Sequence, residues 1–497
     1  MSLHSSLIYA ASYLLQFPAS FIRAPLPSFM FLLLLWSATV HAVAASDGRI
    51  PSWPLDDTSS TAAADNLSVS PDPTLTTKCD LGVSDAPCKP ANARIIVVAQ
   101  DGSGQYTDLK PALDAALPGD TIQIKNGSYT CPSCSGQGGY LLTKSGTKDS
   151  PITIMNYPSH APQLRMTVTI WGEWVLVQGL EITQINGDGI HLNYNLNFAQ
   201  KARHVTIRGN RIHENGFMGI YTAALSDLLI EHNVFERNGL GPGDCITNWT
   251  GGPVSDNYRY AHCHGIYLNN STGTTSNPTP TTGVTIRRNK FINNAGFGWT
   301  NRTDGVRSTN YLIENNLFVN NSLNQGFIDL DHSVIRNNTI VQFTYAHPND
   351  ASKTCFYSNH NTQNIIANNV CYAVLAPNVD SLYPIHSWAN DSTVDNTWVR
   401  NAFFVRSATN WIWSGELVRE FLNTYKSTTK DANGLTIPIV AGDGSEAGFV
   451  NAQNGDFHLI PTSPLVKAGD PAHCPAVDIE GVPRSSKTCV IGAYTIQ

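Results

Sequence analysis

Apolar and polar residues alternate along the chain in short runs, and each run ends at a turn. The segment VTIRGNRIHENGFMGIYT, from Val205 to Thr222, contains three such runs and two turns. Alternation with a period of two is typical of a strand with one buried face. Strands this short cannot bury a core alone, so the segment must share its core with similar copies. Copies begin at Leu228, Val284, Tyr311, Ser333 and Asn364, and a looser copy begins at Val175.

An asparagine holds the same position in each copy, three residues after an apolar residue. These asparagines are Asn210, Asn233, Asn289, Asn316, Asn338 and Asn369, at spacings of 23, 56, 27, 22 and 31. A base period near 22 with insertions predicts a solenoid. The asparagines could occupy turns independently, but their constant register favours a hydrogen-bonded column at one corner. We therefore predict an all-β fold, a right-handed parallel β-helix of three sheets, because parallel crossovers are right-handed.

A strand–helix–strand pattern precedes the first repeat, between residues 94 and 129. Leu109, Leu113 and Leu117 lie on one face of the predicted helix, which ends at Pro118-Gly119. The open end of a β-helix exposes unpaired strand edges, and a helix can cover them. We therefore predict an N-terminal capping helix.

The beginning of the chain has the composition of a secreted protein. Arg23 precedes an apolar run from Phe29 to Trp36, and small residues follow. This pattern predicts a signal peptide over residues 1–45, with a membrane anchor as the alternative. Residues 46–93 are predicted to be a disordered linker and an N-terminal extension, because Ser, Thr, Ala, Asp and Pro dominate most of this stretch. The net charge of −7 argues against a nucleic-acid partner.

The ten cysteines all lie at or after Cys79 and form local pairs in the sequence. An even number of cysteines in a secreted chain predicts disulfides. The pairs are Cys79–Cys88, Cys131–Cys134, Cys245–Cys263, Cys355–Cys371 and Cys474–Cys489. Glycosylation sequons are frequent as well. They include Asn126, Asn248, Asn270, Asn301 and Asn390.

Two groups of motifs carry a family resemblance. DGSGQYTDLKPALDAALPGDTIQIKNGSY and GTKDSPITIMNYPSHAPQL resemble the opening coils of secreted right-handed parallel β-helix proteins of the pectate-lyase-like superfamily. FVNAQNGDFHLIPTSPLVKAG, DIEGVPR and IGAYTI resemble their closing coils. The resemblance covers residues 94–497 and implies that fold. Asn186-Gly187-Asp188 and His264-Gly265 are similar to two motifs of galacturonan hydrolases, whose paired-Asp and Arg-Ile-Lys motifs are missing.

Two insertions, 239–263 and 271–282, flank the strand HGIYL and predict that its sheet forms the floor of a cleft. The first insertion supplies the predicted substrate-binding residues Trp249, Tyr258, Tyr260 and Asp244. Alternation places a column of side chains on the outer face of this sheet, with His264 and His332 at its edges. The predicted catalytic residues are His191, Tyr221, His264, Tyr267, Arg302, Asp329 and Asp331.

Two reactions fit these residues. In β-elimination, Arg302, with Ca²⁺ held by aspartates as the possible cofactor, would neutralise a uronate carboxylate, while histidine or tyrosine moves the protons. In inverting hydrolysis, Asp329 and Asp331 would act as the two carboxylates, roughly 6.6 Å apart along a strand; Asp188, Asp244 and Asp304 are other candidates. A non-catalytic glycan-binding protein would use the same tyrosines. We expect a secreted, monomeric, carbohydrate-active protein acting on a polysaccharide, with the lyase reaction favoured.

Overall fold

The computed structural model describes residues 94–132, 134, 139–183, 186–192, 202–223, 225–240, 263–269, 280–302, 306–343, 355–373, 385–387, 396–405, 412–413, 434–485 and 487–496. All described residues lie within the unit Ser52–Gln497. The predicted signal peptide and linker lie outside the described residues. No helix within the described ranges is long and apolar enough to cross a membrane.

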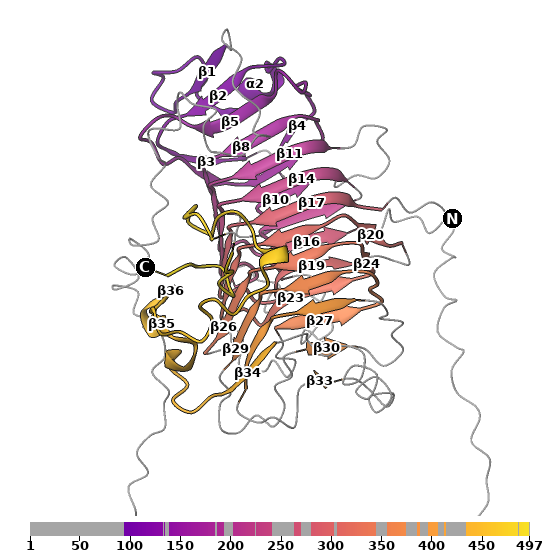
Figure 1. Cartoon of the computed structure of the whole chain (residues 1–497). Helices are drawn as coiled ribbons and strands as arrows, with labels where there is room; N and C mark the ends of the chain where they lie inside the picture. Colours follow the sequence, from indigo (N-terminus) through magenta and orange to yellow (C-terminus); the bar gives the residue numbers. More distant parts are fainter. Residues whose placement is uncertain are drawn as a thin grey trace, which may run out of the picture. The chain divides into compact units, whose positions relative to one another are not determined.

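Three parallel sheets run along one stack of coils, and successive strands of the chain pass from one sheet to the next (Figure 1). The 13-stranded sheet contains β1 (Ile95–Val98), β2 (Thr121–Ile124), β5 (Ile152–Asn156), β8 (Val175–Gln178), β11 (Arg203–Arg208), β14 (Ser226–Glu231), β17 (Thr282–Arg287), β20 (Ser308–Thr309), β21 (Leu312–Glu314), β24 (Leu330–Asp331), β25 (Val334–Arg336), β28 (Ile365–Ala367) and β31 (Thr397–Val399).

The other two large sheets have the same stacking. The 10-stranded sheet contains β4 (Gly139–Leu142), β7 (Thr167–Ile170), β10 (Ile190–Leu192), β13 (Ile220–Ala223), β16 (Ile266–Asn269), β19 (Phe297–Arg302), β23 (Leu323–Ile328), β27 (Phe356–Asn359), β30 (Ile385–Ser387) and β33 (Ile412–Trp413). The 11-stranded sheet contains β3 (Ser128–Thr130), β6 (Gln163–Arg165), β9 (Glu181–Ile182), β12 (Arg211–His213), β15 (Val234–Glu236), β18 (Lys290–Ile292), β22 (Leu317–Val319), β26 (Thr339–Gln342), β29 (Val370–Ala373), β32 (Ala402–Val405) and β34 (Leu435–Pro438).

The predicted asparagine column is confirmed and holds the coils together at one corner. Each amide nitrogen donates to the amide oxygen of the next asparagine, at 2.9 to 3.1 Å, from Asn210 through Asn369 and on to Asn401. The same oxygen also accepts the backbone N–H of the preceding asparagine, as Asn289 does from Asn233 at 2.9 Å. These side chains are buried, so every amide group needs such partners.

A second asparagine column stands at another corner and was not recognised in the sequence. It consists of Asn215, Asn238, Asn294 and Asn321, with successive side chains 2.7 to 2.9 Å apart. Inside the solenoid, Phe235, Phe291 and Phe318 form a nearly parallel stack, with centroids 4.9 and 4.7 Å apart. Identical residues at one position of each coil thus align both the polar corners and the apolar core.

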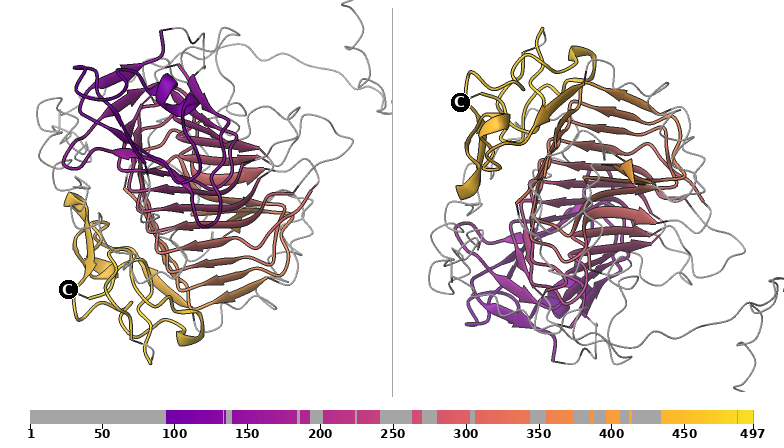
Figure 2. Two further views of the ribbon diagram at one scale, coloured as in Figure 1. Left: turned by 90° about the horizontal axis from the view of Figure 1, so that it is seen from above. Right: turned by 90° about the horizontal axis from the view of Figure 1, so that it is seen from below.

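The C-terminal segment, residues 439–496, folds back along the solenoid and covers part of the 11-stranded sheet (Figures 1 and 2). It contains the hairpin of β35 (Phe449–Asn451) and β36 (Asp456–Leu459), and the 3₁₀ turns η2 (Ser445–Ala447), η3 (Ala452–Asn454) and η4 (Pro471–His473). Its side chains Phe449, Phe457, Leu465 and Ile491 pack with outward residues of β22, β26, β29 and β32. Burying this apolar surface is the main force that holds the segment in place.

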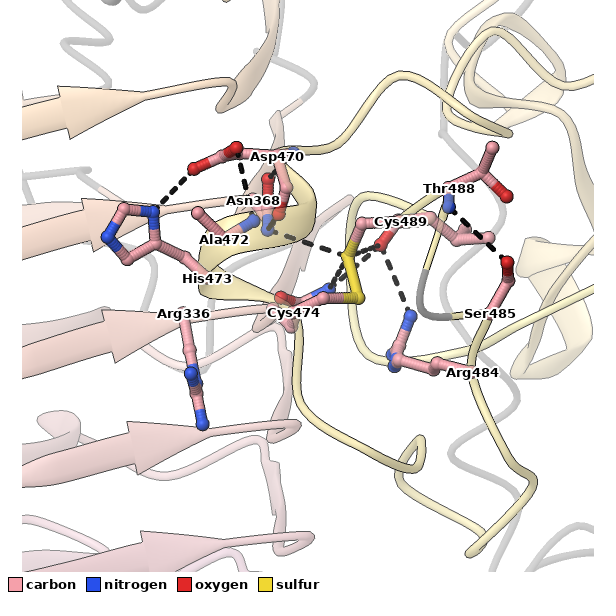
Figure 3. The surroundings of a disulfide bond; sticks show 12 residues. Arg336, Asn368, Asp470, Ala472, His473, Cys474, Arg484, Ser485, Thr488 and Cys489 are labelled. Atoms are coloured by element: carbon pink, nitrogen blue, oxygen red, sulfur yellow. Dashed lines mark hydrogen bonds and ion pairs between the residues drawn. A yellow bond between two sulfur atoms is a disulfide. The ribbon is translucent and has the colours of Figure 1, made fainter.

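Polar contacts fix where the segment lies along the stack. The residues just before Asn316, Asn338 and Asn369 are also asparagines, and they adopt left-handed backbone conformations with φ of 50° to 56°. Asn315 donates to the Val477 carbonyl at 2.9 Å, and Asn337 donates to that of Val490 at 2.8 Å. Asn368 exchanges two hydrogen bonds with Asp470, close to the Cys474–Cys489 disulfide (Figure 3). We call these three residues the docking asparagines.

Three predicted disulfides are confirmed, namely Cys131–Cys134, Cys355–Cys371 and Cys474–Cys489. Cys263 is also disulfide-bonded. Its predicted partner Cys245 lies outside the described residues, as do Cys79 and Cys88. Of the sequons, Asn126 is exposed, whereas Asn301 is completely buried. Glycosylation itself stays a prediction. Asn248, Asn270 and Asn390 lie outside the described ranges.

The helix predicted near the start is present and short. Helix α2 (Leu109–Asp114) begins after Asp108, whose carboxylate accepts the Lys110 N–H at 3.0 Å. Leu109 and Leu113 are buried against β1, β2 and β4 at the N-terminal end of the stack (Figure 1). Leu117 was expected on the same face but is 57% exposed, because the helix ends before it. The role of helix α2 as a cap of the stack stays a prediction.

Replacing one ladder asparagine should destabilise the whole stack. In Asn289→Ala, the N–H and the amide of Asn233 both lose a buried acceptor. We expect a loss of at least about 2 kcal/mol in the free energy of unfolding, measured by urea unfolding with circular dichroism. The exposed Asn454→Ala is the control. Equal unfolding midpoints for the two variants would contradict the structural role of the column.

Removing a docking asparagine should loosen the C-terminal segment. Glycine tolerates the left-handed conformation, so Asn337→Gly removes the side-chain hydrogen bonds to Val490 and Gly492 without adding strain. Hydrogen exchange within residues 439–496 should become faster, by roughly tenfold or more. His232→Gly changes the equivalent corner of an earlier coil and is the matched control. Exchange that stays at the wild-type rate in Asn337→Gly would refute the docking role.

Candidate functional site

The predicted column of side chains is present on the 10-stranded sheet. The inward positions hold completely buried isoleucines, Ile190, Ile220 and Ile266. The next positions pair in register across β10, β13, β16 and β19, in the order His191, Tyr221, Tyr267 and Thr300. The alternation in the sequence therefore predicted both the inward side chains and the order of the column.

The column is less exposed than the sequence suggested. His191 and Tyr267 are 3% and 5% exposed, and Thr300 is 2% exposed, whereas Tyr221 is half-buried. Alternation reports the face on which a side chain lies, but not how closely its neighbours pack around it. The prediction of a solvent-exposed column is therefore wrong for these three buried residues.

Six aromatic rings follow one another across this face, and we call them the aromatic line. In spatial order they are His191, Tyr221, Tyr267, His264, Phe297 and Tyr357. Successive ring centroids lie 5.6, 5.7, 5.3, 5.4 and 5.5 Å apart, at interplanar angles between 57° and 78°. Tilted and edge-to-face contacts of this kind stabilise each ring in its orientation. The line crosses the strands from β10 to β27, and its half-buried members Tyr221 and Tyr357 have ring surface that can pack against the apolar faces of sugars.

A histidine–aspartate pair stands at the first end of the aromatic line. One oxygen of the Asp188 carboxylate contacts Nε2 of His191, and the other accepts the Met218 N–H at 2.7 Å. Both side chains are almost fully buried. When a carboxylate accepts the proton of one imidazole nitrogen, the other nitrogen becomes the basic one. The pair can therefore hold a histidine in a defined tautomer beside Tyr221.

Asn269 is a member of the site that sequence reasoning missed. Its amide nitrogen donates to the Tyr221 hydroxyl oxygen at 3.0 Å. The contact joins β16 to β13, one strand spacing apart. Asn269 lies two residues after Tyr267, so the same alternation that identified the tyrosine could have identified it. A hydrogen bond donated to this oxygen stabilises the phenolate, so it favours loss of the phenol's own proton.

His264 is the most deeply buried member of the aromatic line. Its Nδ1 accepts the Phe297 N–H at 3.0 Å, and the residue is completely buried. Its ring touches the rings of Tyr267 and Phe297. This position favours a supporting role. The ring is held by the hydrogen bond at Nδ1 and by its two ring contacts, so it in turn orients Tyr267 and Phe297. The nearby Gly265 is required by close packing, since a Cβ there would lie 2.4 Å from the Gly298 carbonyl oxygen.

The two aspartates proposed for hydrolysis do not lie in this site. Strand β23 ends at Ile328, and Asp329 occupies the corner after it with φ of 49°. Asp331 belongs to β24 in the 13-stranded sheet, where it pairs with Arg307 at 2.6 Å. Asp329 lies 3.4 Å from Nδ1 of His360. The expected pair along one strand is therefore wrong, because the chain turns between the two residues.

The remaining predicted residues are distributed as follows. Arg302 pairs with Asn269 in the backbone register of β19 and β16. His332 is exposed at a corner beside the 13-stranded sheet and does not border the column. The four substrate-binding candidates lie outside the described residues, namely Trp249, Tyr258, Tyr260 and Asp244, and so does Asp304; Asp244 and Asp304 are two of the three alternative carboxylates.

The outer faces of the other two sheets have a different character. Glu231 pairs with Arg208 and Arg287, at 2.5 and 2.8 Å, on the 13-stranded sheet. On the early coils of the 11-stranded sheet, a hydrogen bond from His213 lowers the pKa of Glu181 to about 2. The later coils of that sheet are apolar and covered by the C-terminal segment. These covered coils are therefore part of the buried apolar core rather than of the solvent-facing surface.

The described residues contain no group of side chains suited to bind calcium. Within them, no three His, Cys, Asp or Glu side chains are grouped as a metal site requires. Asp331, one of the predicted aspartates, is engaged by Arg307 and by the Thr362 N–H at 3.0 Å. A role for calcium stays a prediction.

Residues 167–370 match the family model of the right handed beta helix region. This match and the three parallel sheets confirm the predicted right-handed parallel β-helix. No curated protein matches the sequence.

Similar solved structures include enzymes that act on carbohydrates. An alginate lyase from Paenibacillus sp. str. FPU-7 is 19% identical over 70% of this chain and 96% of its own, with a TM-score of 0.37. The pectate lyase Pel9A is 14% identical over 83% of this chain and 100% of its own, with a TM-score of 0.36. A GH136 lacto-N-biosidase from Eubacterium ramulus is 12% identical over 69% of this chain and 67% of its own, with a TM-score of 0.43. These likenesses bear on the fold alone.

Proposed function

We propose that the protein is carbohydrate-active and cleaves a uronic-acid-containing polysaccharide by β-elimination on the outer face of the 10-stranded sheet. The observation that carries this proposal is the His191–Asp188 pair beside Tyr221 at the end of the aromatic line. The histidine supplies a base, the phenol supplies an acid, and the half-buried rings of the line supply a surface for sugars. β-Elimination needs the base and the acid in one place, together with a group that neutralises the uronate carboxylate.

The elimination would use the two side chains in turn. His191, held through Nε2 by Asp188, takes the proton from C5 of the uronate. The electron pair of that C–H bond forms the C4–C5 double bond, and the C4–oxygen bond breaks. Tyr221 donates its proton to the departing oxygen, and the resulting phenolate is stabilised by the Asn269 amide. Proton exchange with water then restores both groups.

The uronate carboxylate must be neutralised for C5 to become acidic. Arg302 is the residue we propose for this role, because a guanidinium binds a carboxylate bidentately. Its backbone lies in register with Asn269, which contacts Tyr221. Its strand lies two strands from that of Tyr221 and three from that of His191, on the same sheet, and we keep Arg302 as a substrate-binding residue in the proposal.

Hydrolysis is the second candidate, and the described geometry supports it less. Glycoside hydrolysis ordinarily requires two carboxylates on either side of the bond. Of the five aspartates considered, three have described positions, and of these Asp188 alone borders the aromatic line. A single carboxylate bound to histidine fits acid–base catalysis better than the paired mechanism. A protein that only binds glycans would need the aromatic line but not the buried pair.

We also propose that the protein acts as a monomer outside the cell. Disulfides persist in oxidising compartments, and three are present among the described residues. The predicted signal peptide is consistent with the same location. Detection of the mature chain in the culture medium of expressing cells, beginning after residue 45, would test this proposal.

A substrate panel tests the reaction. Purified protein should generate unsaturated ends, seen by ultraviolet absorbance, from polygalacturonate, rhamnogalacturonan or alginate, and none from xylan or galactan. His191→Gln and Tyr221→Phe should each reduce turnover by at least about 100-fold, while Tyr157→Phe, which alters a tyrosine in a turn after β5, should not. Circular dichroism would establish that each variant is folded. Reducing sugar without unsaturated ends would instead indicate hydrolysis, and binding without turnover would indicate a glycan-binding protein.

A further inference from the structure

Two members of the aromatic line are more exposed than the others. Tyr221, next to His191, and Tyr357, at the far end, are half-buried, whereas His191, Tyr267, His264 and Phe297 are between 0% and 5% exposed. Only a ring with accessible surface can pack against a ligand. The middle of the line therefore acts as support, and Tyr221 and Tyr357 are its members with surface to offer.

Register places the two tyrosines on one face at a defined separation. Tyr357 in β27 pairs with Gly326, Gly326 pairs with Thr300, and the column continues through Tyr267 to Tyr221. The two tyrosines are thus four strand spacings apart. At about 4.8 Å for each spacing, this is about 19 Å, a distance that spans several sugar units.

Phe297 packs beside Tyr357 next to a glycine. Gly326 has no side chain, and a Cβ built there would lie 2.8 Å from Cε1 of Phe297 and 2.5 Å from Oγ1 of Thr300. Phe297 thus fills the position of the missing side chain and contacts the Tyr357 ring edge-to-face, with centroids 5.5 Å apart. This contact fixes the orientation of the Tyr357 ring at the far end of the aromatic line.

The column is different on the other side of His191. There it continues with Thr169 and Leu141, which carry no aromatic ring. Among the described positions of the column itself, rings therefore follow the His191–Asp188 pair toward the later coils and not toward the earlier ones.

We infer that Tyr357 forms a distal sugar-binding subsite, so that the glycan chain lies one-sidedly over β13 to β27 with its reacting end at His191 and Tyr221. This inference rests on the proposed function for the nature of the ligand, a uronic-acid-containing chain. The subsite would stack on a sugar ring several units away from the bond that breaks. It gives the protein a preference for long substrates.

The test measures how affinity depends on substrate length. The probes are oligogalacturonates and oligomannuronates, from dimers to chains longer than hexamers. For Tyr357→Ala, KM for the long oligomers should rise up to about tenfold, while kcat and the KM for dimers stay at wild-type values. Tyr357→Phe keeps the ring and should retain the length dependence. Tyr157→Ala, at a half-buried tyrosine in the turn after β5, is the control for loss of a ring elsewhere.

Calorimetric Kd values for the same oligomers separate this inference from the proposed function. If the wild type binds long oligomers without cleaving them, the proposed reaction fails, and the Kd of Tyr357→Ala still decides the subsite. A folded Tyr357→Ala protein with the wild-type length dependence would overturn the subsite, even if elimination is observed. The absence of any binding to either series would overturn both.

Discussion

Hydrogen bonds between buried amide side chains are the constraint on which this molecule depends. Each ladder asparagine satisfies its neighbour and is satisfied in turn, so removing one leaves the next unpaired in a region without water. The ladder also sets the register between coils, and a change of one residue would reverse every side chain that follows. The order of the aromatic line is therefore a consequence of the ladder, although the two lie on different parts of the coil.

Each of the three outer faces has a distinct use. Ion pairs such as Arg208–Glu231 stabilise the 13-stranded sheet, and the C-terminal segment covers the later coils of the 11-stranded sheet. The 10-stranded sheet carries the aromatic line and the histidine–aspartate pair. Because the segment is attached through apolar contacts and the docking asparagines, it can close one face while the site lies on another. The C-terminal segment and the proposed binding site thus use separate surfaces of a single core.

Local patterns in the sequence predicted local features and failed where distant residues meet. The alternation around Ile190 and Ile220 predicted the column on the 10-stranded sheet, because the side of a strand on which a side chain lies depends only on that strand. The burial of His191 depends on neighbours from other coils, which no single repeat contains. Asp329 and Asp331 were misplaced because a left-handed corner follows Ile328, and an aspartate gives little sign of that conformation. The docking asparagines have partners more than a hundred residues later, so only the structure reveals them.

The docking asparagines have a consequence for how such a protein can lengthen in evolution. Their hydrogen bonds join three consecutive coils to fixed residues between 470 and 490. A whole coil duplicated before Asn315 would shift the C-terminal segment together with its binding surface and leave every contact intact. The same duplication between Asn315 and Asn368 would move one docking asparagine away from its partner in the C-terminal segment. The solenoid is therefore free to gain coils at its N-terminal side, and its last coils form a block of fixed length.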